Sequence, residues 1–232
     1  MSVPQRLGDR LSKYRDDWRT FPADAALGFR KEGWYGVWQA FAPRSVYRVI
    51  RYGRLVVFAQ PVDQVEHAMP PGVTIGPLQE QDWPALRTLM GERELNRCRI
   101  LVAAGHAGLI AWRDARPIGY AWVAARLGPE VTACIFPLPP YAAYLWDLYV
   151  IPAERGTGVG TALAAARLRT ARDWGFREGW RTIAPSNGAS LATLWKSGGS
   201  CARVVGEIRY LKLLSGMRTR FVPRVTLDGS ID

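Results

Sequence analysis

The segment that decides the fold runs from Val150 to Thr161 and reads Val150-Ile-Pro-Ala-Glu-Arg155-Gly156-Thr157-Gly158-Val159-Gly160-Thr161. It joins a run of aromatic and branched residues, which predicts a strand, to a segment with helical spacing of apolar residues. Its glycines leave out side chains, so backbone N–H groups can approach a ligand closely. The following helix begins with unpaired N–H groups and the positive end of its dipole. The segment therefore predicts a cradle for an anion such as a pyrophosphate, to which Arg155 adds a fixed positive charge.

Two common phosphate-binding loops do not fit this segment. A Walker loop ends in Gly-Lys-Ser or Gly-Lys-Thr, and residues 150–161 contain no lysine. The dinucleotide fingerprint has a glycine where Thr161 stands, counted from Gly156, and it usually lies early in a fold. What remains is Arg155-x-x-Gly158-x-Gly160 after a strand that ends in Val-x-Pro. A tight connection that binds no ligand stays open as an alternative for this loop alone.

Alternating strands and helices are predicted on both sides of the loop. The helix after it covers residues 158–174 and ends at Gly175. Asp82 can cap an earlier helix that closes at Gly91. Two strands, over 109–113 and 117–126, form a hairpin that turns at residues 114–116. This order predicts an α/β protein, more closely an α+β sandwich on a mixed sheet. The further strands are expected over residues 73–77, 143–151, 181–184 and 204–214, and a further helix over 189–197.

The stretch from His67 to Gly72 is the clearest seam in the chain, because it is rich in proline and lies between two patterned regions. We predict an N-terminal extension over residues 1–70 and the main domain over residues 71–232. Helical spacing of apolar residues predicts a helix over 5–18 in the extension. Residues 46–50 and 55–59 predict a pair of strands around Tyr52-Gly53.

The loop, the strand before it and a helix after it together resemble the GCN5-related N-acetyltransferase (GNAT) superfamily. The acyl-CoA pyrophosphate motif stands intact as Arg155, Gly158 and Gly160, and Asp147-Leu-Tyr-Val150 is similar to the strand that precedes it. The segment from Asn187 to Gly198 resembles the family's second motif, an Asn-led helix that closes in Lys-x-Gly. The resemblance covers roughly residues 73–214. It implies the GNAT fold, a mixed central sheet flanked by helices, with acetyl-CoA or another acyl-CoA as co-substrate.

In this family two central parallel strands separate, and the pantetheine arm of the co-substrate lies in the gap. The resemblance implies that residues 145–151 and 181–184 are these strands. Asn187 and Lys196 would lie on the cofactor side, although a plain helix cap and a solvated lysine explain them about as well. The cofactor-binding residues implied are Leu148, Val150, Arg155, Gly156, Thr157, Gly158, Val159, Gly160, Thr161, Asn187 and Lys196.

The resemblance also implies direct attack of an amine on the thioester, without a covalent intermediate. The amine must lose a proton, and Asp147 is the candidate base. Alternation along the strand puts Asp147 and Tyr149 on one face and Leu148 and Val150 on the other. A structural pair with an arginine is an equal alternative for Asp147. In many relatives a tyrosine protonates the leaving thiolate, and Leu194 stands at that position here. Tyr149 or Tyr144 is then the alternative general acid, or the thiolate leaves unassisted.

Composition narrows the possible classes of protein further. The chain has 232 residues, three cysteines, two histidines and a net charge of +11. The cysteines are far apart and have no histidine at ligand spacing, so no metal site is expected. The longest basic runs are too short for a nucleic-acid-binding arm, and no apolar run is long enough for a membrane span. The charged start of the chain lacks the apolar core of a secretory signal, so we expect a cytoplasmic protein.

The favoured function is transfer of acetyl from acetyl-CoA to the primary amine of a small molecule. The alternatives are transfer of a longer acyl group from CoA or an acyl carrier protein, a non-catalytic acyl-CoA-binding module, and binding to nucleic acid or a membrane surface. No specific nucleic acid is expected as a partner, and a homodimer stays open. Glu92 and Glu94 can attract a cationic acceptor or form a solvated face.

Overall fold

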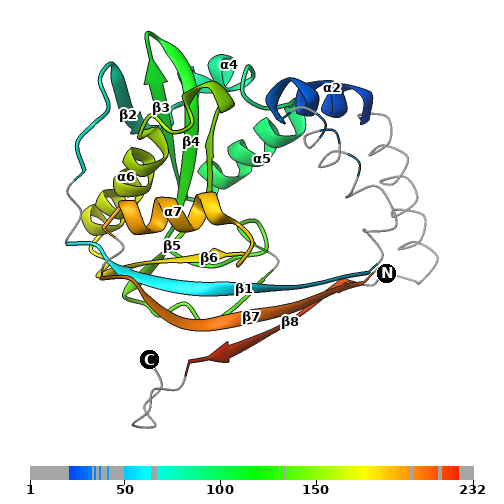
Figure 1. Ribbon diagram of the computed structural model, residues 1–232, viewed down its shortest axis with the longest axis vertical. Helices are drawn as coiled ribbons and strands as arrows, with labels where there is room; N and C mark the ends of the chain where they lie inside the picture. The colour runs from blue at the N-terminus through cyan, green and yellow to red at the C-terminus, as the bar shows by residue number, and fades with distance from the viewer. Residues whose placement is uncertain are drawn as a thin grey trace. The chain divides into compact units, whose positions relative to one another are not determined.

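The strands of the computed structural model form one mixed sheet in the order β2-β3-β4-β5-β6-β1-β7-β8 (Figure 1). The structure describes residues 21–32, 34, 37, 41, 50–63, 67–132, 134–198, 201–213 and 216–224. This sheet confirms the predicted fold class. The strands are β1 (Ile50–Pro61), β2 (Val73–Pro77), β3 (Ala107–Arg113), β4 (Arg116–Ala124), β5 (Ala142–Val150), β6 (Glu178–Ile183), β7 (Arg203–Leu213) and β8 (Gly216–Pro223).

Contacts within the chain divide it into two units. One contains residues 1–51 with 212–216, and the other contains residues 52–211 with 217–232. In the first, helix α2 (Phe21–Glu32) carries Phe21 and Phe29, whose rings lie edge-on to Phe41 and Trp34. The extension predicted over residues 1–70 stays a prediction, and β1 is one unbroken strand of the common sheet. The helix predicted over 5–18 and residues 46–49 of a predicted strand lie outside the described residues.

Helices cover both faces of the sheet in the second unit (Figure 1). On one face α6 (Val159–Asp173) contacts β2 to β6 and lies beside α7 (Gly188–Lys196). On the other face α4 (Trp83–Leu86) and α5 (Glu92–Ala103) pack against β4 and β3. The two faces have separate cores: Leu163 of α6 packs with Ile118 and Val150, whereas Leu95 of α5 packs with Trp122 and Trp146.

The predicted hairpin is confirmed, with β3 and β4 paired from Ala107↔Val123 to Arg113↔Arg116. Its turn is made by Asp114 and Ala115, which have φ values of 49° and 59°. Two left-handed residues in succession match the right-handed twist of the flanking strands. The helix predicted after Asp82 is shorter than expected, because a 3-10 turn over Glu80–Asp82 precedes only four α-helical residues.

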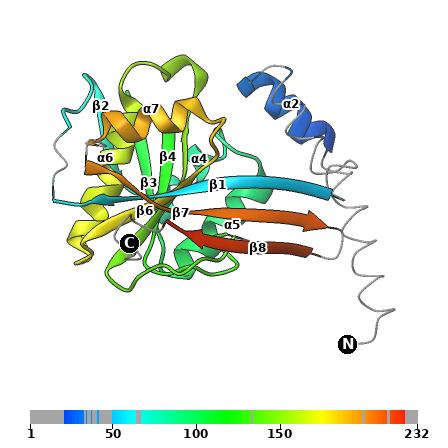
Figure 2. The same ribbon diagram turned by 60° about the horizontal axis from the view of Figure 1, so that its bottom comes forward.

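Beyond β6 the sheet continues into β1, β7 and β8, which run side by side as long strands (Figure 2). Strand β1 pairs with β6 in antiparallel fashion from Val56↔Ile183 to Pro61↔Glu178. One edge of β6 is therefore paired along its length, and only its other edge, toward β5, can open.

Candidate functional site

The parallel strands β5 and β6 pair over three residues and then separate. The pairs are Ala142↔Glu178, Ala143↔Gly179 and Tyr144↔Trp180, whereas β5 continues to Val150 and β6 to Ile183. The β5 edge beyond Tyr144 therefore faces a gap in the sheet. Ile151 donates its N–H to Ile118 O on the β4 side at 3.0 Å. Because N–H directions alternate along a strand, the N–H groups of Val150 and Leu148 point toward the gap.

A bulge in β5 lies beside this gap. Tyr120 of β4 pairs with Tyr149, but Trp122 pairs with Trp146, so β5 has one extra residue between these pairs. Asp147 takes up the irregularity with a φ of 47°. After the bulge the side chains of Leu148 and Val150 face α6, while the Tyr149 ring lies 5.6 Å from that of Tyr120.

The loop between β5 and α6 presents a row of backbone donors. Gly156 and Gly158 have φ values of 83° and 93°, a conformation that other residues rarely adopt. Gly158 is the N-cap of α6, and its carbonyl accepts the N–H of Ala162 at 2.9 Å. Within the described part of the chain, the backbone N–H groups of residues 156–161 donate to no protein acceptor. Thr157 uses its hydroxyl to bond Glu154 O at 2.8 Å, which holds the loop.

Arg155 lies exposed at the rim of this loop. Its Nε donates to Val150 O at 3.2 Å, and its guanidinium lies 5.9 Å from the centre of the Tyr149 ring. The loop is thereby fixed to the end of β5. Val159 and Thr161 are buried in the core, so only their backbone can contribute to the cradle.

Gly160 lies where α6, α7 and β5 meet. A Cβ atom there would lie 3.8 Å from Thr193 Oγ1 and Val150 Cγ2, and 4.0 Å from Leu148 Cδ2. These are ordinary van der Waals distances, so the protein itself tolerates a side chain at this position. Because Gly160 has no side chain, a ligand can approach its backbone closely, next to the loop amides and to the opened edge of β5.

The two remaining predicted cofactor residues lie at opposite ends of α7. Asn187 is the N-cap, and its Oδ1 accepts the N–H of Ser190 at 3.1 Å. Lys196 is exposed in the last turn. The residue of α7 that approaches Gly160 is Thr193, which no sequence pattern indicated.

On the α5 side of the bulge, three charged groups form a chain. Arg97 Nη1 lies 2.8 Å from Glu94 Oε1 and 3.8 Å from Asp147 Oδ2. The Asp147 side chain is 31% exposed. Burial raises the pKa of Asp147 above its ordinary value and Glu94 adds to this, while Arg97 and Arg167 oppose it. A carboxylate with a raised pKa is a stronger base, and its partial exposure leaves it accessible to a proton donor.

Three tyrosines lie near this carboxylate. Burial raises the pKa of Tyr120 well above its ordinary value, with further contributions from Asp147 and Glu94. Tyr120 therefore stays protonated and can act as a donor. Burial raises the pKa of Tyr144 to about 12, and its hydroxyl lies 2.8 Å from Thr182 Oγ1. The ring of Tyr149, the predicted alternative acid, contacts that of Tyr120 at a tilt of 32°.

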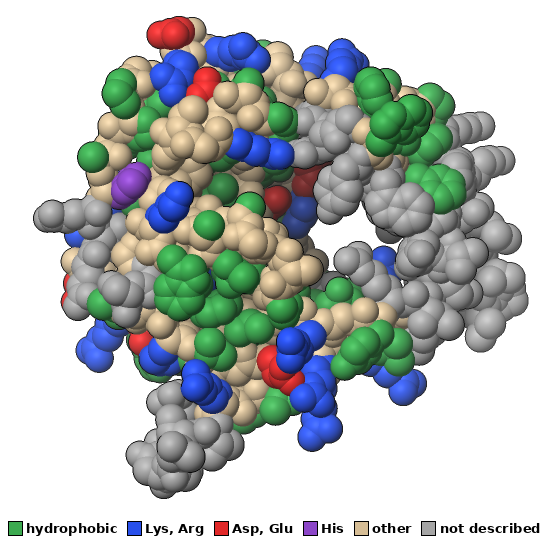
Figure 3. Space-filling model, viewed as in Figure 1, with side chains coloured by type: hydrophobic (Ala, Val, Ile, Leu, Met, Phe, Trp, Pro, Cys, Tyr) green, Lys and Arg blue, Asp and Glu red, His purple; other side chains and the backbone are tan. Residues whose placement is uncertain are grey.

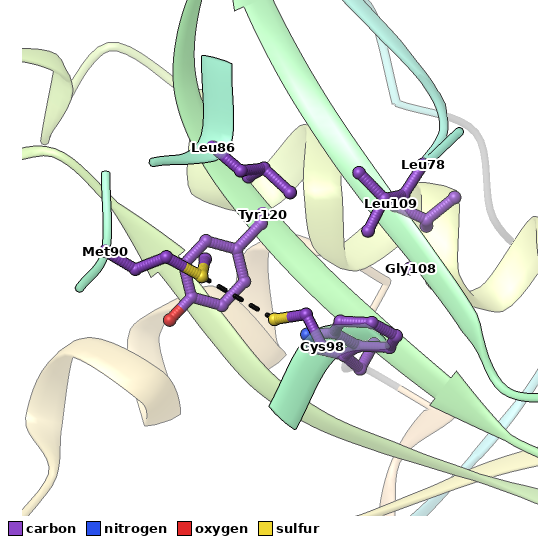
Figure 4. A pocket seen from close by; sticks show the side chains of 8 residues that line it. Leu78, Leu86, Met90, Cys98, Gly108, Leu109 and Tyr120 are labelled. Carbon is purple, nitrogen blue, oxygen red and sulfur yellow. Dashed lines mark hydrogen bonds between the residues drawn. The ribbon is translucent and has the colours of Figure 1, made fainter. Parts of the chain in front are cut away.

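Tyr120 also lines a small apolar hollow between β3, β4, α4 and α5 (Figure 4). Leu86 and Met90 lie on one side of it, and Cys98 Sγ lies 3.6 Å from Met90 Sδ. The lining side chains close against one another and leave no room for a water molecule. Burial raises the pKa of Cys98 to about 12, so its thiol is unreactive near neutral pH. The hollow is therefore part of the packed core next to Tyr120.

Arg97 and Tyr120 were not predicted as site residues. Arg97 follows Glu94 by three residues, a spacing that indicates only a pair on a helix surface. Tyr120 is opposite Tyr149 across β4 and β5. The long connection between these strands hides that register from the sequence.

The profile of the Acetyltransferase (GNAT) family matches residues 74–198. The chain belongs to the GNAT acetyltransferase family. The matched residues include the loop, the bulge, α5 and α7. The resemblance predicted from the sequence is confirmed.

Solved structures with a similar fold include three that illustrate the range. A Drosophila protein has a TM-score of 0.52 and 18% identity over 71% of this chain and 52% of its own. A Novosphingobium aromaticivorans protein assigned to the GNAT family has a TM-score of 0.46 and 16% identity over 68% and 63%. The Salmonella typhimurium protein yncA, solved with acetyl-CoA, has a TM-score of 0.42 and 20% identity over 55% and 79%. This chain spans about half of the Drosophila protein's length. At 18% identity the likeness to the Drosophila protein concerns the fold. No curated protein matches the sequence.

The resemblance to the family predicts a tyrosine at the position of Leu194. Leu194 is fully buried and packs with Phe58 and Ile183, so this position belongs to the core. In the described parts of the chain, no group of three or more His, Cys, Asp or Glu side chains is arranged to hold a metal ion. Among the described helices, none has the length and apolar character needed to cross a membrane.

Proposed function

We propose that this protein is an acyl-CoA-dependent N-acyltransferase that moves an acyl group, in the simplest case acetyl, to the primary amine of a small molecule. The observation that carries the proposal is the row of unengaged N–H groups over residues 156–161, next to the opened edge of β5. Such a row at a helix N-terminus suits a diphosphate. Gly160 lies between this row and the side chains of Leu148 and Val150, and this is where we place the pantetheine arm.

The cofactor-binding residues in this proposal contribute mainly through their backbone. The N–H groups of residues 156–161 bind the pyrophosphate, and Arg155 adds charge from the rim. The N–H groups of Leu148 and Val150 bind the pantetheine and polarise the thioester carbonyl. Asn187 acts in this scheme as the cap of α7, and Lys196 adds long-range attraction for the phosphates.

The chemistry is a direct acyl transfer. The amine nitrogen attacks the thioester carbon, a C–N bond forms, and the C–S bond breaks. Asp147 takes the proton that the acceptor's ammonium group must lose before its nitrogen can attack. The nitrogen releases a second proton once the C–N bond has formed, which balances the proton taken up by the departing thiolate. The thiolate of CoA leaves and takes up a proton, for which the candidate phenol donors are Tyr120 and Tyr149, a cross-strand pair beside the bulge. Glu94 and Asp147 attract the cationic acceptor from the α5 side of the sheet.

The decisive experiment compares two glycines of α6. Gly158 and Gly175 both have positive φ, at 93° and 85°, and lie at the N- and C-terminal ends of the helix. Replacement by alanine strains both positions by roughly 1–2 kcal/mol. We expect calorimetric titration with acetyl-CoA to show binding by the wild type and by Gly175→Ala, and binding at least about tenfold weaker by Gly158→Ala.

Thiol release with a panel of small primary amines then tests catalysis. The proposal is abandoned if the wild-type protein binds no acyl-CoA. Binding without thiol release for any amine would leave an acyl-CoA-binding module, which the core leucine at position 194 would then explain.

A further inference from the structure

Two arginines are buried at the closed end of the gap between β5 and β6. Arg167 comes from α6 and Arg181 from β6, and each is 4% exposed. Arg167 Nη1 donates to Trp146 O at 3.2 Å, on the β5 side of the gap. Arg181 Nη2 donates to Gln60 Oε1 at 2.7 Å, and Gln60 in turn donates to Ser197 O at 2.7 Å.

Both side chains lie on the α6 face of the sheet. Trp180, the last residue of β6 that pairs with β5, packs in the core on the α5 side. Because side chains alternate along a strand, the next residue, Arg181, points to the opposite face. The two guanidinium groups influence one another: burial lowers the pKa of Arg181, and the charge of Arg167 lowers it further.

These two arginines lack the partners that a buried guanidinium needs. Each group has five N–H donors, and the Nε of both is buried without an acceptor in the described residues. No carboxylate among the described residues forms an ion pair with either one. Less buried arginines elsewhere are paired, since Arg113 lies 3.1 Å from Glu154 and Arg203 lies 2.9 Å from Glu178. The charge of Asp147 opposes the lowering of the Arg167 pKa by burial but forms no ion pair with it, and no acid in the described part of the chain does the same for the pKa of Arg181. Buried cations that are so poorly paired are costly, so their presence calls for an anion.

A purely structural role accounts for only part of this arrangement. Arg167 replaces the missing strand partner of the Trp146 carbonyl, which uses one of its donors. This hydrogen bond explains neither the presence of Arg181 nor why both buried groups are cations. A neutral donor such as glutamine would serve the same carbonyl without placing a charge in the core.

We propose that Arg167 and Arg181 bind a carboxylate at the far end of the transferred acyl group, so that the donor is the CoA thioester of a dicarboxylic acid. This inference rests on the proposed function and narrows its acyl donor. We place the thioester at the bulge, held by the N–H of Leu148. On the other side of Asp147, toward the closed end of the gap, lies Trp146. The proposal places an acyl chain of a few carbons between the bulge and the two guanidinium groups, of which Arg167 already contacts the Trp146 carbonyl. The transfer itself is unchanged: the C–S bond breaks, the C–N bond forms, and the distal carboxylate stays ionised on the product.

The test compares succinyl-CoA with butyryl-CoA, which has the same chain length and a methyl group in place of the carboxylate. Binding is measured by calorimetry without an acceptor, so that only the acyl group can supply the carboxylate. We expect the wild type to bind succinyl-CoA at least about tenfold more tightly than butyryl-CoA, the value of one hydrogen-bonded charge pair. Arg181→Gln and, as a second variant, Arg167→Gln should bring this ratio to about one. Arg172→Gln removes the same charge from an exposed position on α6 and should keep the ratio.

Each result decides the inference. Equal binding of the two thioesters by the wild type overturns it and leaves the proposed function standing. A succinyl preference that persists in both folded variants also overturns it, because the carboxylate is then bound elsewhere. If neither thioester nor free CoA binds, the inference and the proposed function fall together. Thermal unfolding of each variant shows whether a lost preference reflects a lost fold.

Discussion

Asp147 has a backbone conformation that few residues other than glycine and asparagine adopt. Its φ of 47° lies in the left-handed region, where a short polar side chain is tolerated better than a branched one. Strain of this kind persists only where the surrounding structure imposes it, and it gathers at functional sites. Here the neighbouring pairs Tyr120↔Tyr149 and Trp122↔Trp146 hold the bulge in place. The strained residue is also the proposed base.

We predict that Asp147→Asn lowers kcat/KM by about 10²–10⁴-fold. Burial raises the pKa of Asp147, so the base form exists above this raised value and activity falls as the pH drops through it. A pH profile of kcat/KM should show this acidic limb in the wild type. The variant should lack the limb, and its remaining pH dependence should be that of the acceptor amine. An unchanged rate and profile would leave Asp147 as the structural partner of Arg97.

The raised pKa of Asp147 also predicts how Asp147→Asn changes the unfolding free energy. A carboxyl group whose pKa is higher in the folded than in the unfolded state favours folding when protonated. Its contribution is present below the unfolded pKa and is lost as the pH rises through the folded pKa. The amide that Asp147→Asn introduces cannot ionise, so we expect the unfolding free energy of the variant near neutral pH to equal or exceed that of the wild type. Urea unfolding at several pH values measures this.

Gly160 offers a prediction in which stability and binding change in opposite directions. Alanine fits the protein here, since its Cβ would be no closer than 3.8 Å to other atoms, and it favours a helix by up to about 1 kcal/mol. The methyl group would, however, occupy the space proposed for pantetheine. We expect Gly160→Ala to raise the melting temperature and to weaken acetyl-CoA binding at least about tenfold.

Gly188→Ala is the matched control for this change. Gly188 is in the first turn of α7, and no atom lies within 4 Å of its added Cβ. The control should gain stability and keep its affinity. Equal affinity of both variants for acetyl-CoA would mean that the space at Gly160 is not used by the co-substrate.

At the scale of single elements, α7 is fixed by its cap. Asn187 Oδ1 satisfies the N–H of Ser190, so Asn187→Ala should lower the unfolding free energy by about 1 kcal/mol. Serine is an equally good cap, and Asn187→Ser should restore most of this loss. Acetyl-CoA titration of both variants separates the cap from a ligand contact. A cap alone predicts similar affinities, whereas direct bonding to the co-substrate predicts a loss in both.

The elements that the sequence predicted well are those whose ends are marked by specific residues. The loop glycines and Gly175 limit α6, and Asn187 begins α7, so both helices were placed within about two residues. The hairpin of β3 and β4 was found because two apolar runs flank a short polar turn. The fold and the candidate cradle therefore followed from local residue chemistry.

The bulge and α5 could not be predicted in the same way. Residues 142–150 form a nearly continuous apolar run, in which an extra residue leaves no trace in the alternation. In α5 the buried Leu95, Cys98 and Leu101 recur every three residues, but charged residues on either side hide the pattern. The burial of Arg167 could not be predicted either, because a charged residue within a helix is normally assigned to the exposed face.

At the scale of the whole molecule, the sheet separates two kinds of chemistry. The loop amides, Gly160 and the buried arginines lie on the α6 face, whereas Asp147, Glu94 and Arg97 lie toward α5. The two faces of the sheet are connected at the gap between β5 and β6, where the strands no longer pair. The proposed transfer uses this division, because the acyl donor and the amine can then bind independently and meet only at the bulge.

The net charge of +11 acts on the whole surface, and basic side chains are spread over the face seen in Figure 3. Such a field attracts a polyanionic donor over distances that salt shortens to about 10 Å at 0.1 M. If the donor is a CoA thioester, raising NaCl from about 0.05 M to about 0.5 M should lower its kcat/KM several-fold through slower association. S-acetyl-N-acetylcysteamine has the same thioester but no phosphate, and its kcat/KM should change little. Steady-state rates for both donors at matched salt give the two slopes. Parallel slopes would mean that salt acts on the acceptor or on the protein, and that the phosphates of the donor are not what the charge attracts.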